Sequence, residues 1–305
     1  MADPRDDGFI YDEFALFADN AADAGLAWTG PPTVQRVEHR LDDGRTMSAL
    51  RWGSEEPRVV LLHGGGQNAH TWDTMALALG LPLLAIDLPG HGHSDEPAAD
   101  VALSPRVLAT DMAATIAALA PHADAVIGMS LGGMTSLGVA VVAPALVRRL
   151  MLIDITPGTD REKASDIIAF LAGPESFASF DEILERTVAF NPTRSESSLI
   201  RGILHNAVER DDGRWVWRHQ RAGRERVLDE QTEVDFDALW DDLARVAVPT
   251  RLLVGDRSPV VSDADVERFR ALRPDDEVIT VADAGHSIQG DQPLVLADHV
   301  RAFLD

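Results

Sequence analysis

Hydrophobic residues along this chain form short uninterrupted runs that alternate with longer amphipathic stretches. Apolar runs such as 59–62, 83–86 and 150–153 lack a polar face, which is typical of strands buried on both sides of a sheet. Alternating strands and helices predict an α/β fold with a mostly parallel sheet flanked by helices. The expected strands are 34–41, 47–52, 59–62, 83–86, 125–127, 150–153, 250–254 and 277–281, and the expected helices are 70–79, 107–119, 131–142, 264–272 and 293–304.

The alternation stops in the middle of the chain, where amphipathic helical patterns occur without any buried strand run. We therefore expect a core made of 34–157 and 244–305, interrupted by a helical cap or lid at 158–243. Such a lid belongs over the carboxyl ends of the strands, where open α/β sheets bind their ligands. Residues 1–33 mix aromatic and acidic side chains, and they are predicted to form an N-terminal arm that lies on the body.

One serine lies at a predicted junction between a strand and a helix. Ser130 is the centre of the motif Gly-Met-Ser-Leu-Gly at 128–132. A tight turn there pushes the hydroxyl out of the sheet, and the flanking glycines avoid the clashes that larger side chains would make. Gly-x-Ser-x-Gly alone is a weak signal, but between a buried strand and a helix it predicts a nucleophile.

A glycine-rich loop, His-Gly-Gly-Gly at 63–66, follows the buried strand at 59–62. Acyl transfer develops negative charge on a former carbonyl oxygen, and backbone N–H groups aimed at that oxygen stabilise it. Because glycines let the backbone approach a substrate closely, the N–H of Gly65, or of Gly66 as the alternative, is expected to be one donor. The N–H of Leu131, next to the serine, is the expected second donor of this oxyanion hole.

Three histidines in expected loops are candidates for chemistry. His286 follows the last expected strand, at the place in the chain where a serine hydrolase supplies its general base. We therefore predict that His286 accepts the proton of Ser130. His91 and His93 alternate within one turn with no third ligand cluster nearby, so we interpret them as structural rather than as ligands of a metal.

A general base of this kind needs a carboxylate that fixes its tautomer and stabilises the imidazolium. Two aspartates compete for the role. Asp154 follows the expected strand at 150–153, and Asp256 follows the expected strand at 250–254. An ionised aspartate at the carboxyl end of a buried strand is costly without a partner, which indicates a functional role.

These motifs together resemble those of the α/β-hydrolase superfamily over residues 34–305. The matching segments are the His-Gly-Gly-Gly loop, Asp-Leu-Pro-Gly-His-Gly-His-Ser at 87–94, the turn around Ser130 and Gly-His at 285–286. The resemblance implies a serine hydrolase, with the fold and the lid described above.

The resemblance also bears on the acid. Many members of the superfamily carry it in a Gly-x-x-Asp loop after a late strand, but here the corresponding residue is Ser258. Some esterase-like members carry the acid after the strand that follows the nucleophile helix. This chain resembles them, because Asp154 stands directly after the strand at 150–153. That likeness implies Asp154 as the acid, with Asp256 as the alternative.

Candidate pocket residues lie in the lid and next to the catalytic motifs. Trp215 and Trp217 would share one face of an extended segment, and His205 lies in the same inserted region. Trp72 and Met129 are close in sequence to the oxyanion loop and to the nucleophile. An apolar pocket lined by these residues suits a small, largely apolar ester or lactone, cleaved through an acyl-enzyme.

Other functions remain open at this point. The same triad serves thioesters, carbon–carbon bonds of dienoic acids and cofactor-free perhydrolysis in related families. A protein that keeps the fold and only binds a ligand is a further alternative. The proposed chemistry requires neither a metal nor an organic cofactor.

Composition restricts the expected partners. The formal net charge of −23 repels nucleic-acid phosphates and anionic lipid, so we expect a small-molecule substrate and neither nucleic acid nor a membrane as partner. The chain has no cysteine, which excludes disulfides and thiolate chemistry. Its first residues lack a secretory pattern and no run of about 18 apolar residues occurs, so a cytoplasmic location is expected. The oligomeric state is not predicted.

Overall fold

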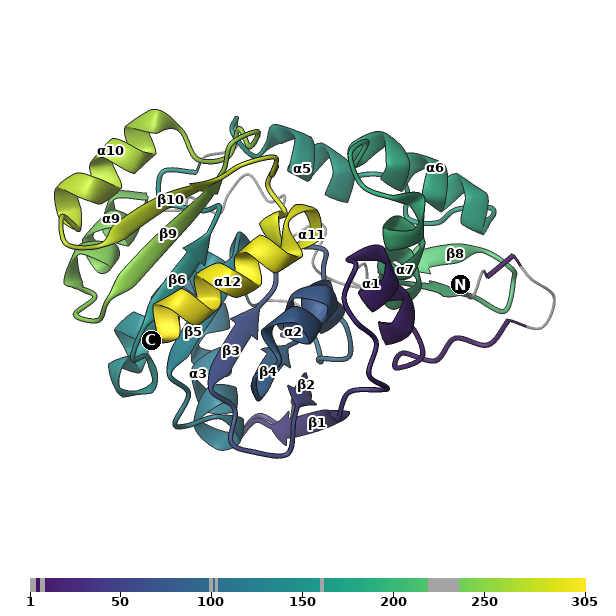
Figure 1. The fold of residues 1–305 in the computed structure, drawn as a ribbon, viewed down its shortest axis with the longest axis horizontal. Helices are drawn as coiled ribbons and strands as arrows, with labels where there is room; N and C mark the ends of the chain where they lie inside the picture. The colour runs from purple at the N-terminus through teal and green to yellow at the C-terminus, as the bar shows by residue number, and fades with distance from the viewer. Residues whose placement is uncertain (1–3, 6–8, 99–100, 102–103, 160–161, 219–235) are drawn as a thin grey trace.

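The computed structural model describes residues 4–5, 9–98, 101, 104–159, 162–218 and 236–305. Its centre is an eight-stranded sheet with the strand order β1-β2-β4-β3-β5-β6-β9-β10 (Figure 1). The strands are β1 (Val34–Arg40), β2 (Thr46–Trp52), β3 (Val59–Leu62), β4 (Leu83–Ile86), β5 (Ala125–Met129), β6 (Leu150–Ile153), β9 (Thr250–Gly255) and β10 (Glu277–Val281). The fold is therefore the α/β sheet that the hydrophobic pattern predicted, with strand bounds that differ by at most two residues.

The pairing of the strands determines where the loops meet. β1 and β2 are antiparallel, as are β2 and β4, whereas β4, β3, β5, β6, β9 and β10 pair in parallel. Leu62 lies opposite Gly128, and Met129 lies opposite Ile153, so β3, β5 and β6 end at one edge of the sheet. The loops that follow these strands therefore emerge side by side, where ligands bind in such sheets.

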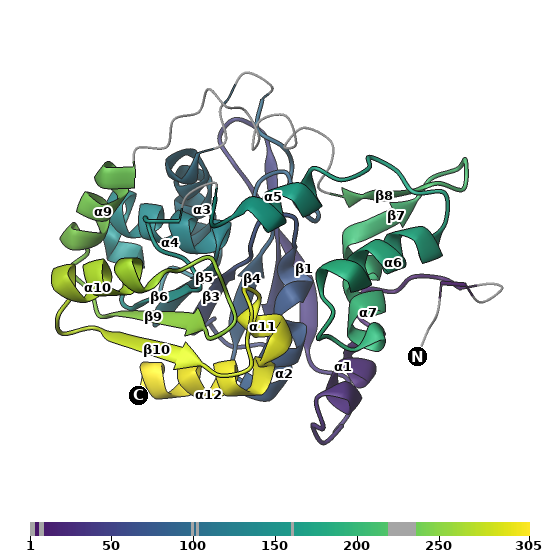
Figure 2. The ribbon, with the colours of Figure 1, turned by 90° about the horizontal axis from the view of Figure 1, so that it is seen from above.

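Two layers of helices cover the sheet (Figures 1 and 2). Val60 and Leu62 point into one hydrophobic cluster and Val59 and Leu61 into another, as expected from the two-residue period of a strand. The first cluster includes residues of α3 (Pro105–Leu119), α4 (Leu131–Val142), α9 (Phe236–Arg245) and α10 (Asp263–Leu272). The second includes residues of α1 (Phe17–Asp23), the 3-10 helix η1 (Ala69–Trp72), α2 (Asp73–Leu79), α11 (Ile288–Asp291) and α12 (Pro293–Leu304). A short 3-10 helix, η2 (Pro144–Leu146), follows α4.

A separate group of elements lies beyond the edge of the sheet that carries these loops (Figures 1 and 2). It contains α5 (Ser165–Leu171), α6 (Phe180–Phe190), α7 (Glu196–Asn206), and a hairpin of β7 (Ala207–Glu209) and β8 (Trp215–Trp217). The hairpin was not predicted, because its strands are too short to form an apolar run. Residues 219–235, which belong to the expected lid, lie outside the described residues.

The expected end of the lid at residue 243 is too late. Leu239, Trp240 and Leu243 of α9 are buried in the first core cluster and thus belong to the body. The helix is amphipathic like those of the lid, so its sequence pattern alone does not distinguish a helix on the sheet from a helix above it.

The N-terminal arm contacts both parts of the molecule. Phe17 is buried in the second core cluster with Trp52, whereas Leu16 is buried in a third cluster formed by the lid. Asp23 at the end of α1 forms an ion pair with Arg201 of α7, with 2.7 Å between the charged atoms. The arm therefore joins the lid to the sheet.

Candidate active site

Ser130 forms the sharp turn between β5 and α4. Its backbone is in a region that L-residues rarely adopt, with φ 51° and ψ −120°. The two flanking glycines allow this turn. A Cβ on Gly128 would lie 2.2 Å from the carbonyl oxygen of Gly132, and a Cβ on Gly132 would lie 2.2 Å from that of Leu62. The motif therefore has the geometric reason for glycine that the sequence suggested.

The loop after β10 holds His286 against a buried carboxylate. The Nδ1 atom of His286 lies 2.7 Å from Oδ2 of Asp154. The Nε2 atom is buried and has no hydrogen-bond partner among the described residues. Both His286 and Ser130 line the same cavity. An imidazole fixed at one nitrogen and free at the other is the arrangement that a general base requires.

Asp154 is fully buried and receives several donors. Besides His286, its carboxylate accepts hydrogen bonds from the N–H of Gly255 at 2.9 Å and from the hydroxyl of Ser258. Its backbone has a positive φ of 49°, and the residue follows β6, which pairs with β9 in the sheet. Ser258, in the place of the acid of many relatives, thus serves as a donor to the acid.

The alternative acid lies elsewhere. The Asp256 side chain is exposed and accepts a hydrogen bond of 3.1 Å from the backbone N–H of Ala284. It has no contact with His286 among the hydrogen bonds and ion pairs of the described residues. Its geometry is that of a residue that stabilises the turn between β9 and the His286 loop.

The glycine-rich loop after β3 approaches the serine closely. A Cβ on Gly64 would lie 2.5 Å from Sδ of Met129 and 3.4 Å from Cβ of Ser130. The N–H groups of Gly65 and Leu131 donate to no acceptor in the described part of the chain. The N–H of Gly66, by contrast, donates to Nε2 of His91 at 3.1 Å, so it is not available as a donor to a substrate.

His63 and His91 build this loop. Burial lowers the pKa of His63 to about 3, and its Nε2 accepts the N–H of Leu88 at 2.9 Å. Burial also lowers the pKa of His91, so its ring is neutral at Nε2 and can accept the Gly66 N–H. Gln67 then connects the loop to the other side of the site, because its side chain bonds Gly64 and Ser287.

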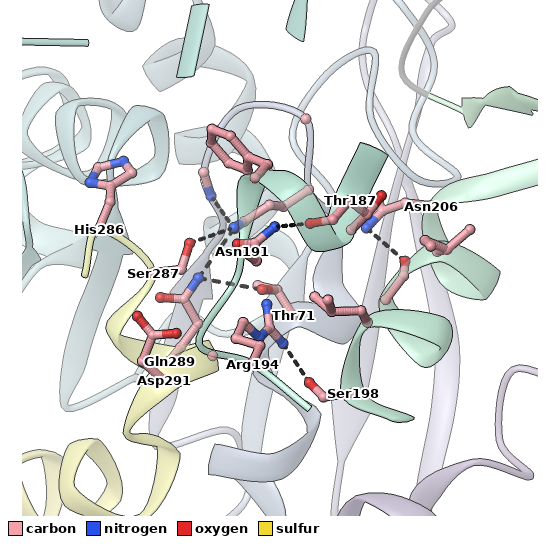
Figure 3. A pocket seen from close by; sticks show the side chains of 18 of the residues that line it. Thr71, Thr187, Asn191, Arg194, Ser198, Asn206, His286, Ser287, Gln289 and Asp291 are labelled. Carbon is pink, nitrogen blue, oxygen red and sulfur yellow. Dashed lines mark hydrogen bonds between the residues drawn. The ribbon is translucent and has the colours of Figure 1, made fainter. Parts of the chain in front are cut away.

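A cavity of about 310 Å³ lies beside Ser130 and His286 (Figure 3). Met129, Trp217 and His205 line it, as the sequence suggested. Its apolar lining comes mainly from the lid, and the residues are Ile167, Phe170, Leu171, Phe190, Ile203 and Trp217. Many polar side chains also line it, which the expectation of a largely apolar pocket did not include.

Two predicted pocket residues do not line this cavity. Trp72, the last residue of η1, is fully buried among the side chains of the second core cluster and does not reach the cavity. Trp215 packs edge-on against Phe180, with ring centroids 5.1 Å apart, and stabilises the lid. Closeness in sequence to a catalytic motif does not fix the side of the backbone on which a side chain lies.

Residues 59–299 match the alpha/beta hydrolase family. The chain belongs to this family. Its relatives include the esterase Rv0045c of Mycobacterium tuberculosis, which is 43% identical over 302 residues and covers 96% of each chain. The crystal structure of that esterase has a TM-score of 0.84, with 42% identity over 97% of this chain and 98% of the other. The 2-(acetamidomethylene)succinate hydrolase of Mesorhizobium japonicum is 25% identical over 272 residues, which cover 88% of this chain and 95% of that protein.

Within this hydrolase, His205 belongs to a buried polar cluster between arm, body and lid. Its ring stacks on that of His70 with centroids 3.8 Å apart, and its Nδ1 lies 2.7 Å from the Tyr11 hydroxyl. His70 in turn contacts Asp73 at 2.9 Å and Glu13 at 3.2 Å. Although burial disfavours the imidazolium, these two carboxylates raise the pKa of His70 to about 9. Burial lowers the pKa of His205 well below its ordinary value, so a charged ring stacks on a neutral one.

This cluster is also the group whose ligand atoms could hold a metal ion. Atoms of His70, Asp73 and His205 lie within 4.8 Å of one another. Both nitrogens of His70 are already hydrogen-bonded to carboxylates, so a cation there would have to displace that bonding. The geometry is explained by the ion pairs between the arm and the body.

Sequence reasoning missed polar residues that the fold brings to the hydrolase cavity. Gln289 of α11 donates to Gln67 and Thr71, and Arg194 lies in the loop before α7 (Figure 3). No motif marks these positions, because their role depends on packing between the lid and the body. Only Ser258 was marked in the sequence, because it stands where the Gly-x-x-Asp pattern has its aspartate.

None of the helices in the described ranges combines the length and apolar character needed to cross a bilayer.

Proposed function

We propose that this enzyme hydrolyses small carboxylic esters through a triad of Ser130, His286 and Asp154. The single observation that carries the proposal is the state of the imidazole. One nitrogen of His286 is held by a fully buried aspartate at 2.7 Å, and the other is unpartnered in the cavity that Ser130 lines. Ester hydrolysis also agrees with the relative called an esterase.

The reaction proceeds in two halves. Nε2 of His286 removes the Ser130 proton while Oγ attacks the acyl carbon, and Asp154 stabilises the imidazolium that forms. The N–H groups of Gly65 and Leu131 bind the oxyanion. Collapse breaks the bond to the alkoxy oxygen, which takes the proton from His286 and leaves as the alcohol. His286 then activates water, which releases the acid and restores the serine hydroxyl.

No hydrogen bond joins Ser130 Oγ to Nε2 in the structure. Catalytic hydrogen bonds of this kind often tighten only in the substrate complex. The apolar part of the ester lies against the lid residues Phe170, Leu171 and Trp217. Because the described lid residues 162–218 contribute this part of the cavity lining, they act as the cap in this proposal.

A fluorophosphonate probe tests the proposal, since it reacts only with an activated serine. We expect labelling of the wild type at Ser130 and hydrolysis of p-nitrophenyl butyrate. Both are lost in Ser130→Ala, while Ser54→Ala, which removes an exposed hydroxyl outside the cavity, keeps them. An unlabelled wild type would indicate a protein that only binds its ligand, and labelling at a different serine would replace the nucleophile.

A further inference from the structure

One cation of the catalytic cavity lacks a carboxylate partner. The guanidinium of Arg194 donates to Oγ of Ser198 at 2.7 Å, and its Nε is buried without any hydrogen bond. No carboxylate of the described residues lies within ion-pair distance of it. Arginine carries five N–H donors and stays protonated, so most of its hydrogen-bonding capacity is unused here.

The other arginine of the cavity shows the contrast. Arg201 pairs with Asp23 at 2.7 Å and donates to Asn20 at 2.7 Å, so its charge is neutralised by the N-terminal arm. A charge that is withdrawn from water costs free energy unless it is paired. Burial accordingly lowers the pKa of Arg194. An arginine guanidinium nevertheless keeps its charge in proteins.

The surroundings of Arg194 fix the guanidinium close to the chemistry. A Cβ on Gly290 would lie 2.9 Å from its Cζ, so the group packs on the backbone of α11, four residues after His286. Asp291 lines the same cavity, but its Oδ2 accepts the N–H of Gly285 at 2.9 Å. The negative charge of Asp291 acts on Arg194 and favours its protonated form, but the two side chains form no ion pair among the described residues.

The cavity is therefore amphiphilic. Aromatic and aliphatic residues of the lid line part of the cavity, and Arg194, Gln289 and Thr71 lie close together within it (Figure 3). A neutral ester would contact the apolar residues and leave the guanidinium unpaired. A free carboxylate matches it, because carboxylate and guanidinium form charge-assisted hydrogen bonds in a planar fork.

We propose that Arg194 binds a carboxylate of the substrate, so that this enzyme prefers esters that carry a second, free carboxylate. Half-esters of dicarboxylic acids place that group on the acyl side, and acylated hydroxy acids place it on the alcohol side. The inference depends on the proposed function, since it names the substrate class of the same site.

Two matched pairs of esters test this preference, one pair for a carboxylate on the acyl side and one for a carboxylate on the alcohol side. Mono-p-nitrophenyl adipate is compared with p-nitrophenyl heptanoate, and 4-acetoxybenzoate with its methyl ester. For at least one pair, we expect the wild type to favour the anionic member in kcat/KM. Arg194→Met should reduce that preference by about tenfold to a hundredfold, mainly through KM, as expected for a lost hydrogen bond between charged groups.

Controls separate this inference from a general loss of activity. Arg194→Lys retains the charge and should keep part of the preference. Arg245→Met removes the same charge from a side chain that is 72% exposed and does not line the cavity, so it should change neither pair. Kinetics with the neutral esters should stay within about twofold in Arg245→Met, because electrostatic effects of exposed charges are largely screened. In the two Arg194 variants, kcat/KM for the neutral esters should fall less than kcat/KM for the anionic esters.

Binding without turnover provides a second measurement. Adipate should bind to Ser130→Ala in a calorimetric titration, and the heat should disappear in Ser130→Ala/Arg194→Met. An unchanged ester preference in Arg194→Met, or equal binding by the two Ser130→Ala proteins, would overturn the role of Arg194 while neutral-ester hydrolysis still supports the triad. Absence of any ester hydrolysis would instead remove the proposed function itself.

Discussion

The replacement of Asp154 by asparagine is the sharpest test of the triad. Three donors meet at this buried carboxylate: Nδ1–H of His286 and the hydroxyl of Ser258 at one oxygen, and the N–H of Gly255 at the other. An amide keeps one acceptor and gains two donors. If its oxygen accepts from Gly255, its NH₂ group faces His286. The ring must then accept at Nδ1 and carry its proton on Nε2, where it cannot take the proton of Ser130.

The opposite orientation of the amide is worse. Its NH₂ group would face the buried N–H of Gly255, and each unsatisfied donor there costs about 1–3 kcal/mol. The structure thus selects the inactive tautomer. The corresponding change in a serine protease triad lowers kcat about 10⁴-fold, or roughly 5.5 kcal/mol of transition-state stabilisation, and we expect a similar loss with Asp154→Asn.

The assay is steady-state hydrolysis of p-nitrophenyl butyrate, with thermal unfolding as a check that the variant folds. KM should change little, because Asp154 is buried behind His286. Asp256→Asn is the matched control, since this exposed aspartate bonds only the Ala284 N–H, and its kcat should stay within about threefold. A decrease of less than tenfold with Asp154→Asn, or an equal decrease with both variants, would refute the assignment.

Three further predictions concern stability. Gly132→Ala should lower the free energy of unfolding by several kcal/mol in urea titrations, because its Cβ would lie 2.2 Å from a backbone oxygen. The matched variant is Gly202→Ala in α7, whose Cβ would meet no atom within 4 Å. It should stabilise the helix by about 0.5–1 kcal/mol. Equal midpoints for the two variants would contradict this reading. Burial would raise the pKa of Glu13, but hydrogen bonds from His70 and Arg36 outweigh this effect and lower the pKa to about 2. The contribution of Glu13 to the free energy of unfolding is therefore present above pH 4.5 and is lost as the pH falls toward 2. The pKa of His70 is raised from 6.5 to about 9, so its contribution to the free energy of unfolding is fully present below pH 6.5. Up to about 3 kcal/mol of that contribution is lost as the pH rises to 9. Denaturation curves of His70→Gln should not show this loss.

The sheet could be predicted, and the main residues of the candidate site could be named from the sequence, because each has a local cause. Four-residue apolar runs need burial on both faces, and they form β3, β4 and β6 with the predicted bounds. Ser130 was found from the glycines that its turn requires. These signals lie within a few residues of the feature that they indicate.

The lid and the pocket depend on contacts between distant segments. An amphipathic helix such as α9 has the same spacing of hydrophobic residues whether it packs on α4 in the body or lies in the lid. The sequence pattern therefore did not show that α9 belongs to the body. Trp72 and Trp215 were expected in the pocket, but the direction of each side chain is set by the elements that pack around it. Arg194 gave no signal, because an unpaired arginine is recognised only when its neighbours are known.

The position of the acid shows how topology and sequence combine. β6 and β9 are neighbours in the sheet, with Ile153 opposite Leu253, so a carboxylate at the end of either strand can reach His286. Strand order therefore permits both positions and does not choose between them. In the proposed triad, Ser258 favours Asp154 as the acid, because a hydroxyl can donate a hydrogen bond to a carboxylate but cannot replace its charge. The proposal thus places the aspartate after β6, where its carboxylate contacts both His286 and Ser258.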